Sequence, residues 1–165
     1  MTSKTKLLGH AVHPMLVHVP LGLFVTTALF DTIDRFAGHA TSLAVASFWN
    51  SVAGVASALV AAFFGMLDLF AIPRNTRAFR IGIAHGLGNL VMTGMFGICA
   101  ALRWSNPGYR LGAGGFVLEL AAVSLSMVTV WLGTELIEHL GVAVDDTAHL
   151  DAPSSLHDIP VHRPH

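Results

Sequence analysis

The sequence has little charge and almost no cysteine. Only 12% of its 165 residues are charged, whereas 53% are hydrophobic and the mean hydropathy is +0.64. This composition is too apolar and too poorly charged for an ordinary soluble domain, and it favours a membrane environment. The single cysteine, Cys99, excludes an internal disulfide and a cysteine-based zinc or iron–sulfur site.

Other absences narrow the function. The net charge of −1 provides no basic field for a nucleic acid, and no nucleic-acid-binding motif is present, so we expect no nucleic-acid partner. The sequence also has no phosphate-binding loop and no nucleophile–base arrangement. It offers no support for a hydrolytic or group-transfer enzyme, and electron transfer is the furthest activity that we expect.

Four apolar runs are each long enough to span a bilayer. We expect spans at about 15–36, 45–70, 80–103 and 112–140, which predict an all-α integral membrane protein with a four-helix bundle in residues 1–144. The topology is up-down-up-down. The first run contains His18 and Pro20 and no small-x-small site follows it, so we expect a retained helix rather than a signal peptide. Residues 145–165 are polar, acidic and proline-containing, which predicts a disordered tail.

The basic residues indicate an orientation. More of them lie in the segments on the side of the termini, namely Lys4, Lys6, Arg74, Arg77, Arg80 and Arg163, than on the other side, which has Arg35, Arg103 and Arg110. Because cytoplasmic segments carry the excess of Lys and Arg, both termini are predicted to be cytoplasmic. Trp49 and Trp104 then lie at the outer interface, where indole rings are enriched.

Polar residues of the four runs gather at the side that carries the termini. His18 and His85 follow the starts of the first and third runs, and at about 1.5 Å per residue both lie roughly 6–8 Å into their helices. Asp68 and Glu135 precede the ends of the second and fourth runs. The positive end of a helix dipole favours neutral imidazole, which is the form that binds metals. We therefore expect a cluster of histidines and carboxylates at the cytoplasmic face.

A haem between helices is the first interpretation of this cluster. His18 and His85 lie on helices that would be diagonal in the bundle, and imidazole is an axial ligand of haem iron. We predict b-type haem with His18 and His85 as ligands, Asn89 orienting the ring of His85, and Gly22 and Gly86 thinning the pocket walls. Asp68, Asn89 and Glu135 would support the site or handle protons. The protein would then be a redox module that exchanges electrons with a partner protein.

Two alternatives stay open. The first is a divalent transition metal or a proton site in a small transporter-like protein, formed from His10, His13, His18, Asp68, His85 and Glu135. The second is a structural or accessory subunit without a cofactor, in which the same side chains only form hydrogen bonds between helices. A homo-oligomer is compatible with any of these.

Polar residues near the other face receive less weight. Asp31 and Arg35 are four residues apart and can pair along one helix face. Glu135 and His139 have the same spacing at the cytoplasmic face, where they could offer two ligands to a non-haem ion. Glu119, Asn50 and Arg103 form a second candidate polar group near the outer face.

Four stretches of the chain, taken in order, carry a family resemblance. They are His10-x-x-His13-Pro14-Met15-Leu16-Val17-His18-x-Pro20-Leu21-Gly22, then Gly65-Met66-Leu67-Asp68 with Ile72-Pro73, then His85 with Asn89, and finally Trp131-Leu132-Gly133-Thr134-Glu135-Leu136 with Gly141-Val142-Ala143-Val144. Together they resemble a bacterial membrane family known as domain of unknown function 2231, over about residues 9–144. The resemblance implies a four-span inner-membrane protein, and the family's fusions to Rieske and cytochrome c domains imply electron transfer. The chain departs from the family pattern at Glu138 and His139.

Overall fold

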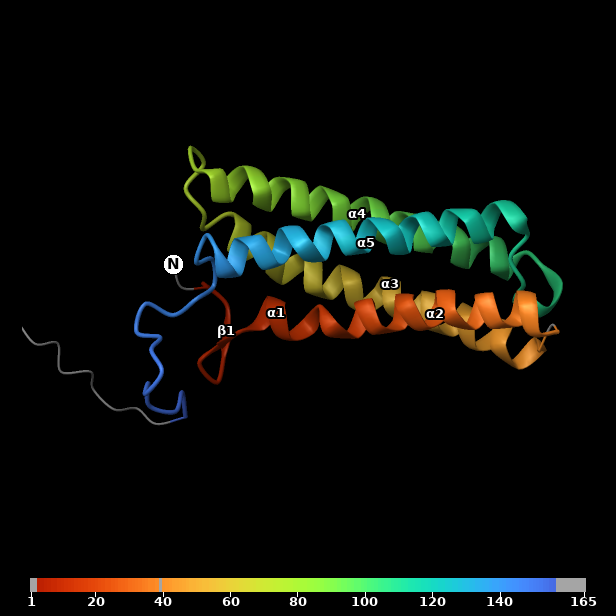
Figure 1. Ribbon diagram of the computed structural model, residues 1–165, viewed down its shortest axis with the longest axis horizontal. Helices are drawn as coiled ribbons and strands as arrows, with labels where there is room; N and C mark the ends of the chain where they lie inside the picture. Colours follow the sequence, from red (N-terminus) through yellow and green to blue (C-terminus); the bar gives the residue numbers. More distant parts are fainter. Residues whose placement is uncertain (1–2, 39, 157–165) are drawn as a thin grey trace, which may run out of the picture.

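Four long helices form an antiparallel bundle in the computed structural model, which describes residues 3–38 and 40–156 (Figure 1). The long helices are α2 (His18–Ala37), α3 (Thr41–Leu69), α4 (Arg77–Trp104) and α5 (Ala113–Glu138). A short helix α1 (Val12–Leu16) precedes α2, and a 3-10 turn η1 (Pro107–Tyr109) lies between α4 and α5. The only strands of the described part are β1 (Lys6–Leu7) and β2 (His10–Ala11), which pair as a small antiparallel hairpin. The prediction of an all-α bundle is confirmed.

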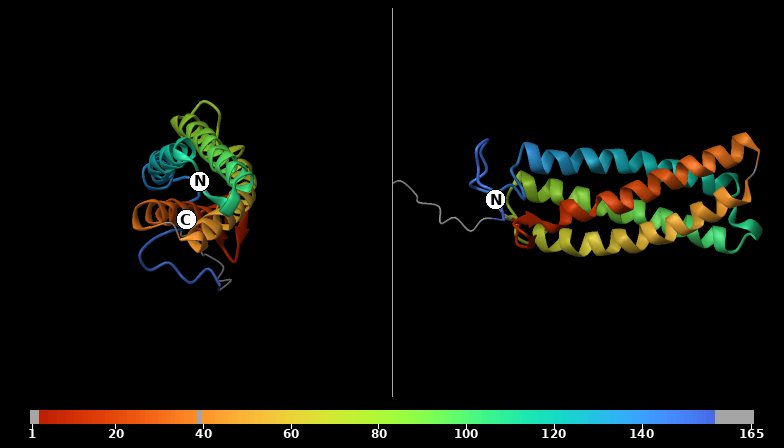
Figure 2. Two further views of the ribbon diagram at one scale, coloured as in Figure 1. Left: turned by 90° about the vertical axis from the view of Figure 1, so that its right-hand side faces the viewer. Right: turned by 90° about the horizontal axis from the view of Figure 1, so that it is seen from below.

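The helices are arranged in chain order around the bundle axis. Helix α2 packs chiefly against α3, α4 packs against both α3 and α5, and α1 packs mainly against α3. The two ends of the described chain lie at the same end of the bundle, which we call the termini end (Figure 2). The opposite end, where α2 connects to α3 and α4 connects to α5, is called the far end.

Each of the four spans is long and apolar enough to cross a membrane. They cover 26 to 29 residues, counting α1 and α2 together, and reach about 39–44 Å at 1.5 Å per residue, which exceeds a hydrocarbon core of about 30 Å. Large apolar side chains such as Leu90, Val117 and Met127 are exposed on the outside of the bundle. Such a surface suits contact with lipid rather than water. Trp49 and Trp104 are also exposed, and both belong to helix ends at the far end.

The first span is interrupted between α1 and α2. Pro20 has no N–H to donate to the carbonyl of Leu16, and its ring crowds that carbonyl, which weakens the helix at this point. The helix is resumed by the bond from Leu21 N to Val17 O, at 3.3 Å. His13 lies on α1 and His18 on α2, and Val17 between the two helices keeps helical backbone angles.

An apolar layer fills the middle of the bundle. The rings of Phe24 on α2 and Phe96 on α4 are stacked with centroids 4.0 Å apart, and Met92 and Ala122 complete the buried cluster. Gly54 allows the ring of Phe24 to lie against the backbone of α3, since a Cβ at Gly54 would be 2.6 Å from that ring. The layer separates a polar cluster at the termini end from another at the far end.

The tail begins after α5 with a residue in the left-handed region, Gly141 (φ 62°), two residues beyond the C-cap His139. Its described part, up to residue 156, has no helix and is bound to the N-terminal segment. Lys6 pairs with Asp145 at 2.7 Å, and His10 Nε2 lies 3.1 Å from the hydroxyl of Ser155. The bond from Lys6 holds the pKa of Asp145 below its usual range. The remainder of the predicted disordered tail, 157–165, lies outside the described residues.

Candidate functional site

Two histidines face each other near the termini end of the bundle. The ring centroids of His13 on α1 and His85 on α4 are 6.3 Å apart, and the ring planes are nearly perpendicular at 89°. Both side chains are half-buried. The structure therefore pairs His85 with His13, whereas the sequence analysis paired it with His18.

Backbone carbonyls of two further helices fix the ring orientation of the pair. Nδ1 of His13 lies 2.8 Å from the carbonyl of Ala61 on α3, and Nδ1 of His85 lies 2.8 Å from the carbonyl of Thr129 on α5. A carbonyl oxygen only accepts hydrogen bonds, so each Nδ1 must carry the proton. Neutral rings with this tautomer present the lone pair of Nε2, which is the atom that can bind a metal or a proton.

Asn89 completes the arrangement around His85. Its amide nitrogen lies 3.2 Å from Nε2 of His85 and donates to the backbone carbonyl of His85 at 2.9 Å. Its amide oxygen accepts from the hydroxyl of Thr129 at 3.1 Å. The side-chain amide of Asn89 keeps its bond to the backbone carbonyl of His85. A ligand could therefore take the lone pair of Nε2 without leaving Asn89 unsatisfied. The prediction that Asn89 contacts the ring of His85 agrees with this geometry.

Two glycines make room for the rings. A Cβ on Gly65 of α3 would lie 2.7 Å from Cε1 of His13, and a Cβ on Gly133 of α5 would lie 2.9 Å from Cε1 of His85. These contacts mean that each ring is set into the backbone of a neighbouring helix. The four sequence stretches that carried the family resemblance thus meet at this one place, through His13, Gly65, His85 and Gly133.

His18 and His10 lie away from the pair. His18 is exposed, and its Nδ1 is 3.4 Å from the carbonyl of Met15. Together with His10 it lines an open, mostly apolar groove of about 500 Å³, whose other wall includes Ile137 of α5. The structure gives no contact between His18 and His85. His18 is five residues beyond His13, which on a helix turns its side chain by about 140° from that of His13.

The two predicted carboxylates have partners of their own. Asp68 accepts hydrogen bonds from the hydroxyl of Ser3 at 2.7 Å and from the backbone of Lys4 at 3.2 Å, so it fixes the N-terminal segment to α3. Glu135 pairs with Arg77 at 2.6 Å and with His139 at 2.5 Å. The bond from Glu135 raises the pKa of His139. Neither carboxylate contacts the histidine pair.

The glycines expected to line a haem pocket have open surroundings. A Cβ on Gly22 or on Gly86 would meet nothing within 4 Å. Gly65 and Gly133, not Gly22 and Gly86, are therefore the glycines against which histidine rings pack. Within residues 3–38 and 40–156, no group of three or more His, Cys, Asp or Glu side chains is arranged to hold a metal ion. Among the described residues, His13 and His85 are the two imidazoles that lie together at this end.

A buried ion cluster lies at the far end. Arg103 of α4 donates to both carboxylate oxygens of Asp31 on α2, with the Nη1–Oδ1 bond at 3.0 Å, and its Nη2 also donates to Glu119 of α5 at 2.5 Å. Arg103 and Glu119 are fully buried, and Asp31 nearly so. We call these three residues the Arg103 cluster. The second candidate polar group of the sequence therefore exists through Glu119 and Arg103, with Asp31 as its third member.

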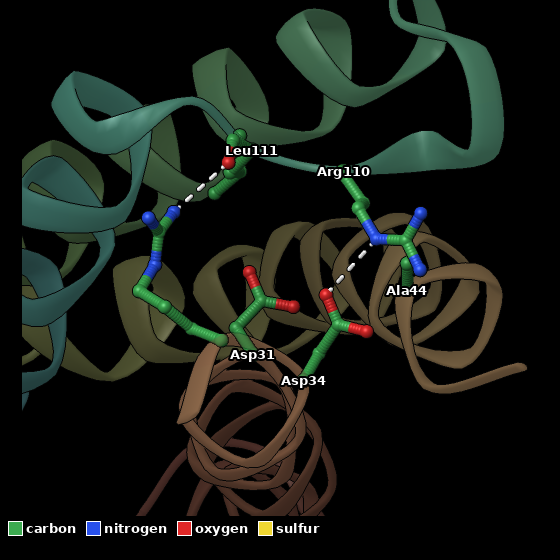
Figure 3. A pocket seen from close by; sticks show the side chains of 6 residues that line it. Asp31, Asp34, Ala44, Arg110 and Leu111 are labelled. Carbon is green, nitrogen blue, oxygen red and sulfur yellow. Dashed lines mark hydrogen bonds and ion pairs between the residues drawn. The ribbon is translucent and has the colours of Figure 1, made fainter. Parts of the chain in front are cut away.

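A small cavity adjoins the cluster. It has a volume of about 60 Å³ and is lined by Asp31, Asp34, Arg35, Ala44, Arg110 and Leu111. Figure 3 shows Asp31 beside Asp34, and Ala44 beside Arg110. Arg110 donates to Asp34 at 3.2 Å. Arg35 donates to the carbonyl of Leu111 at 3.0 Å and lies over the ring of Phe116. The expected pairing of Arg35 with Asp31 is wrong, because Asp31 is engaged by Arg103.

The sequence predicted the far end less completely than the termini end. Arg103 and Glu119 were candidates there, whereas Asp31 was expected to pair only along its own helix. The available signal was the occurrence of a carboxylate well inside each of two apolar runs, which is costly unless the charge is paired within the bundle.

Comparison with known proteins gives one family. A family model described as a predicted membrane protein, DUF2231, matches residues 9–146. No curated protein and no solved structure matches the chain.

Proposed function

We propose that this chain, which belongs to the DUF2231 family of predicted membrane proteins, is a multi-pass membrane protein with a redox-active metal centre between His13 and His85. In this proposal it works as an electron-transfer module for a partner protein. Its location is the bacterial inner membrane, with both termini in the cytoplasm. The centre then lies near the cytoplasmic face.

The observation that carries the proposal is that both rings are fixed through Nδ1, so that Nε2 is the nitrogen with the free lone pair. Each Nδ1 is held by a carbonyl of a different transmembrane helix, at 2.8 Å in both cases. Metal-binding histidines commonly donate their second ring nitrogen in this way, because the bond fixes the tautomer and the ring orientation. A purely structural histidine needs no such symmetry between two rings that face each other.

The spacing of the rings is compatible with a shared metal. If both Nε2 atoms bound one ion from opposite sides, two metal–nitrogen bonds of about 2.0–2.1 Å and roughly 1 Å from each nitrogen to its ring centre would span about 6 Å. The centroids of His13 and His85 are 6.3 Å apart. Haem b iron with these two axial ligands is the leading candidate, since imidazoles hold haem iron in many electron-transfer sites. A single divalent transition-metal ion is the second candidate, and copper or iron would fit the proposed electron transfer, because imidazole binds both and both change oxidation state.

The test is an absorption spectrum of the detergent-purified protein, before and after dithionite, together with its metal content. A haem centre gives a Soret band that shifts on reduction. His13→Ala and His85→Ala should each abolish the band, whereas His18→Ala, the matched control on the same span, should retain it. Each variant is checked for folding by circular dichroism.

The alternative outcomes are distinct. A colourless protein with one metal ion per chain, lost in His13→Ala and in His85→Ala, assigns the centre to a non-haem ion. A colourless and metal-free protein refutes the metal centre and leaves the pair as a hydrogen-bonded junction of helices. Loss of the band in His18→Ala with retention in His13→Ala would show that the wrong histidine has been chosen.

A further inference from the structure

The Arg103 cluster has more negative than positive groups. One guanidinium serves two carboxyl groups, and its Nη2 donates to an oxygen of each, Oδ2 of Asp31 and Oε2 of Glu119. With both carboxyl groups ionised the cluster would carry one net negative charge inside the membrane-spanning bundle. A buried charge without a counter-ion is strongly unfavourable, so a group in this position neutralises instead.

Two further arginines, Arg35 and Arg110, line the cavity beside Asp31, and each has a hydrogen bond to another residue. Arg35 binds the carbonyl of Leu111, and Arg110 binds Asp34. Helix α3 has no titratable side chain near the cluster within its described length, since Asp68 is at the termini end. The remaining titratable groups that face the cluster are Cys99 of α4, whose thiol is 3.6 Å from the carbonyl of Gly115, and Asp34 of α2 at the cavity.

Glu119 has an oxygen that suits a proton. Its Oε2 accepts from Arg103, but its Oε1 is buried and has no hydrogen-bond partner among the described residues. An ionised carboxylate oxygen without a partner in a low-dielectric site carries the full cost of lost hydration. A proton on Oε1 removes that cost and brings the net charge of the cluster to zero.

The cavity supplies a route for the proton. Its volume of about 60 Å³ is large enough to admit water, and its lining is rich in polar groups that can bind water. Asp31 belongs both to the cavity wall and to the cluster, as Figure 3 shows for its carboxyl group beside Asp34 and Arg110. Water in the cavity can therefore exchange a proton with Asp31. Transfer between Asp31 and Glu119 needs a water molecule to enter between the two carboxyl groups, because the guanidinium of Arg103 keeps its protons.

We propose that the Arg103 cluster is a proton-binding site of the far end, in which Asp31 and Glu119 together hold one exchangeable proton, on Oε1 of Glu119, that equilibrates with water through the cavity. The bound species is a proton taken from water, so no bond other than O–H forms or breaks. The site is independent of any metal at His13 and His85.

The experiment is infrared spectroscopy of the full-length protein in lipid vesicles at neutral pH. The wild type should show the carbonyl-stretch band of one protonated carboxyl group, and the band should shift when water is exchanged for D₂O. Glu119→Gln should lose the band. Asp31→Asn should lose it as well, because Arg103 and Glu119 then form a neutral pair. Glu138→Gln, which changes an exposed glutamate of the same helix, is the matched control and should retain it.

A further variant tests the route. Ala44→Leu places a larger side chain in the cavity and should slow the D₂O-induced shift severalfold without removing the band. The proposal is overturned if the wild type has no band, if the band survives Glu119→Gln or Asp31→Asn, or if Ala44→Leu exchanges as fast as the wild type. Circular dichroism of each variant separates these outcomes from a failure to fold.

Discussion

Replacing Arg103 by methionine is the most informative single change to the stability of the bundle. The side chain is fully buried and makes three hydrogen bonds to carboxylate oxygens of Asp31 and Glu119. Methionine keeps much of the length and the apolar contacts but removes the only cation of the cluster. Both carboxyl groups must then be neutral for the folded state to persist.

The cost follows from the extra proton. A carboxyl group ordinarily ionises near pH 4, so keeping one more carboxyl protonated at pH 7 costs about 4 kcal/mol, at about 1.36 kcal/mol per pH unit. This figure agrees with about 3–5 kcal/mol for breaking a buried ion pair by removing one partner. No discount for solvent screening applies, because the guanidinium has no exposed surface.

The pH dependence gives a second, independent signature. Folded Arg103→Met binds one more proton than the wild type does, whereas the unfolded chains bind equal numbers. Since stability falls with rising pH wherever the folded state binds more protons, the deficit of the variant grows above pH 5 and shrinks below it. The expected change between pH 5 and pH 7 is about 1.4 kcal/mol per unit.

The assay is reversible unfolding by SDS in mixed micelles, followed by far-ultraviolet circular dichroism. Arg77→Met, which removes a half-exposed arginine from an ion pair with Glu135, is the control and should cost less than about 1 kcal/mol. The triple variant Asp31→Asn, Arg103→Met, Glu119→Gln should recover most of the loss. A deficit of Arg103→Met no larger than that of Arg77→Met, or one that does not change with pH, would refute the reasoning.

Three further predictions concern the termini end and the membrane topology. Gly133→Ala should displace the ring of His85 and lower cofactor content at least tenfold in a metal assay, whereas Gly86→Ala, which meets no neighbour, should leave it unchanged. Glu135→Gln should return the raised pKa of His139 toward its ordinary value in an NMR titration; because that pKa is raised, the stabilising contact is present at low pH and is lost as the pH rises through it, and an unchanged titration would contradict the assignment. A reporter that is active only in the cytoplasm should be active when it is fused to either terminus. Activity of a reporter that works only in the periplasm, at both termini, would reverse the proposed orientation.

The four helices could be predicted because their signal is local. Each span is a run of apolar residues with a length set by the bilayer, and its ends are marked by polar turns such as the one between α3 and α4. The N-cap of α4 is an example, since Thr76 accepts from the backbone of Phe79 at 3.2 Å. Length and composition suffice for such features, and no knowledge of the neighbouring helices is needed.

The partner of His85 could not be predicted from how deep each histidine lies along its helix. Depth along the helix placed His85 correctly near the termini end, but depth is silent on the direction in which a side chain points. His13 is directed at α3, whereas His18 is exposed. The two are five residues apart, so on a helix of 3.6 residues per turn their side chains point about 140° apart. The direction of each side chain around the helix axis, and not its depth, therefore decides which histidine faces His85.

The Arg103 cluster at the far end can also be predicted from the depth of its charged residues along their helices. Six residues separate Asp31 from the last residue of α2, and six separate Glu119 from the first residue of α5, so both carboxylates lie about 9 Å inside the bundle at 1.5 Å per residue. Arg103 is one residue from the end of α4, and its long side chain reaches inward to meet them. A helix-surface pair such as Asp31 with Arg35 gains only about 0.2–0.5 kcal/mol, whereas two carboxylates at one depth in an apolar bundle need a shared cation. Matching charged residues by depth across helices would therefore have found the Arg103 cluster from the sequence, before any pairing along one helix was considered.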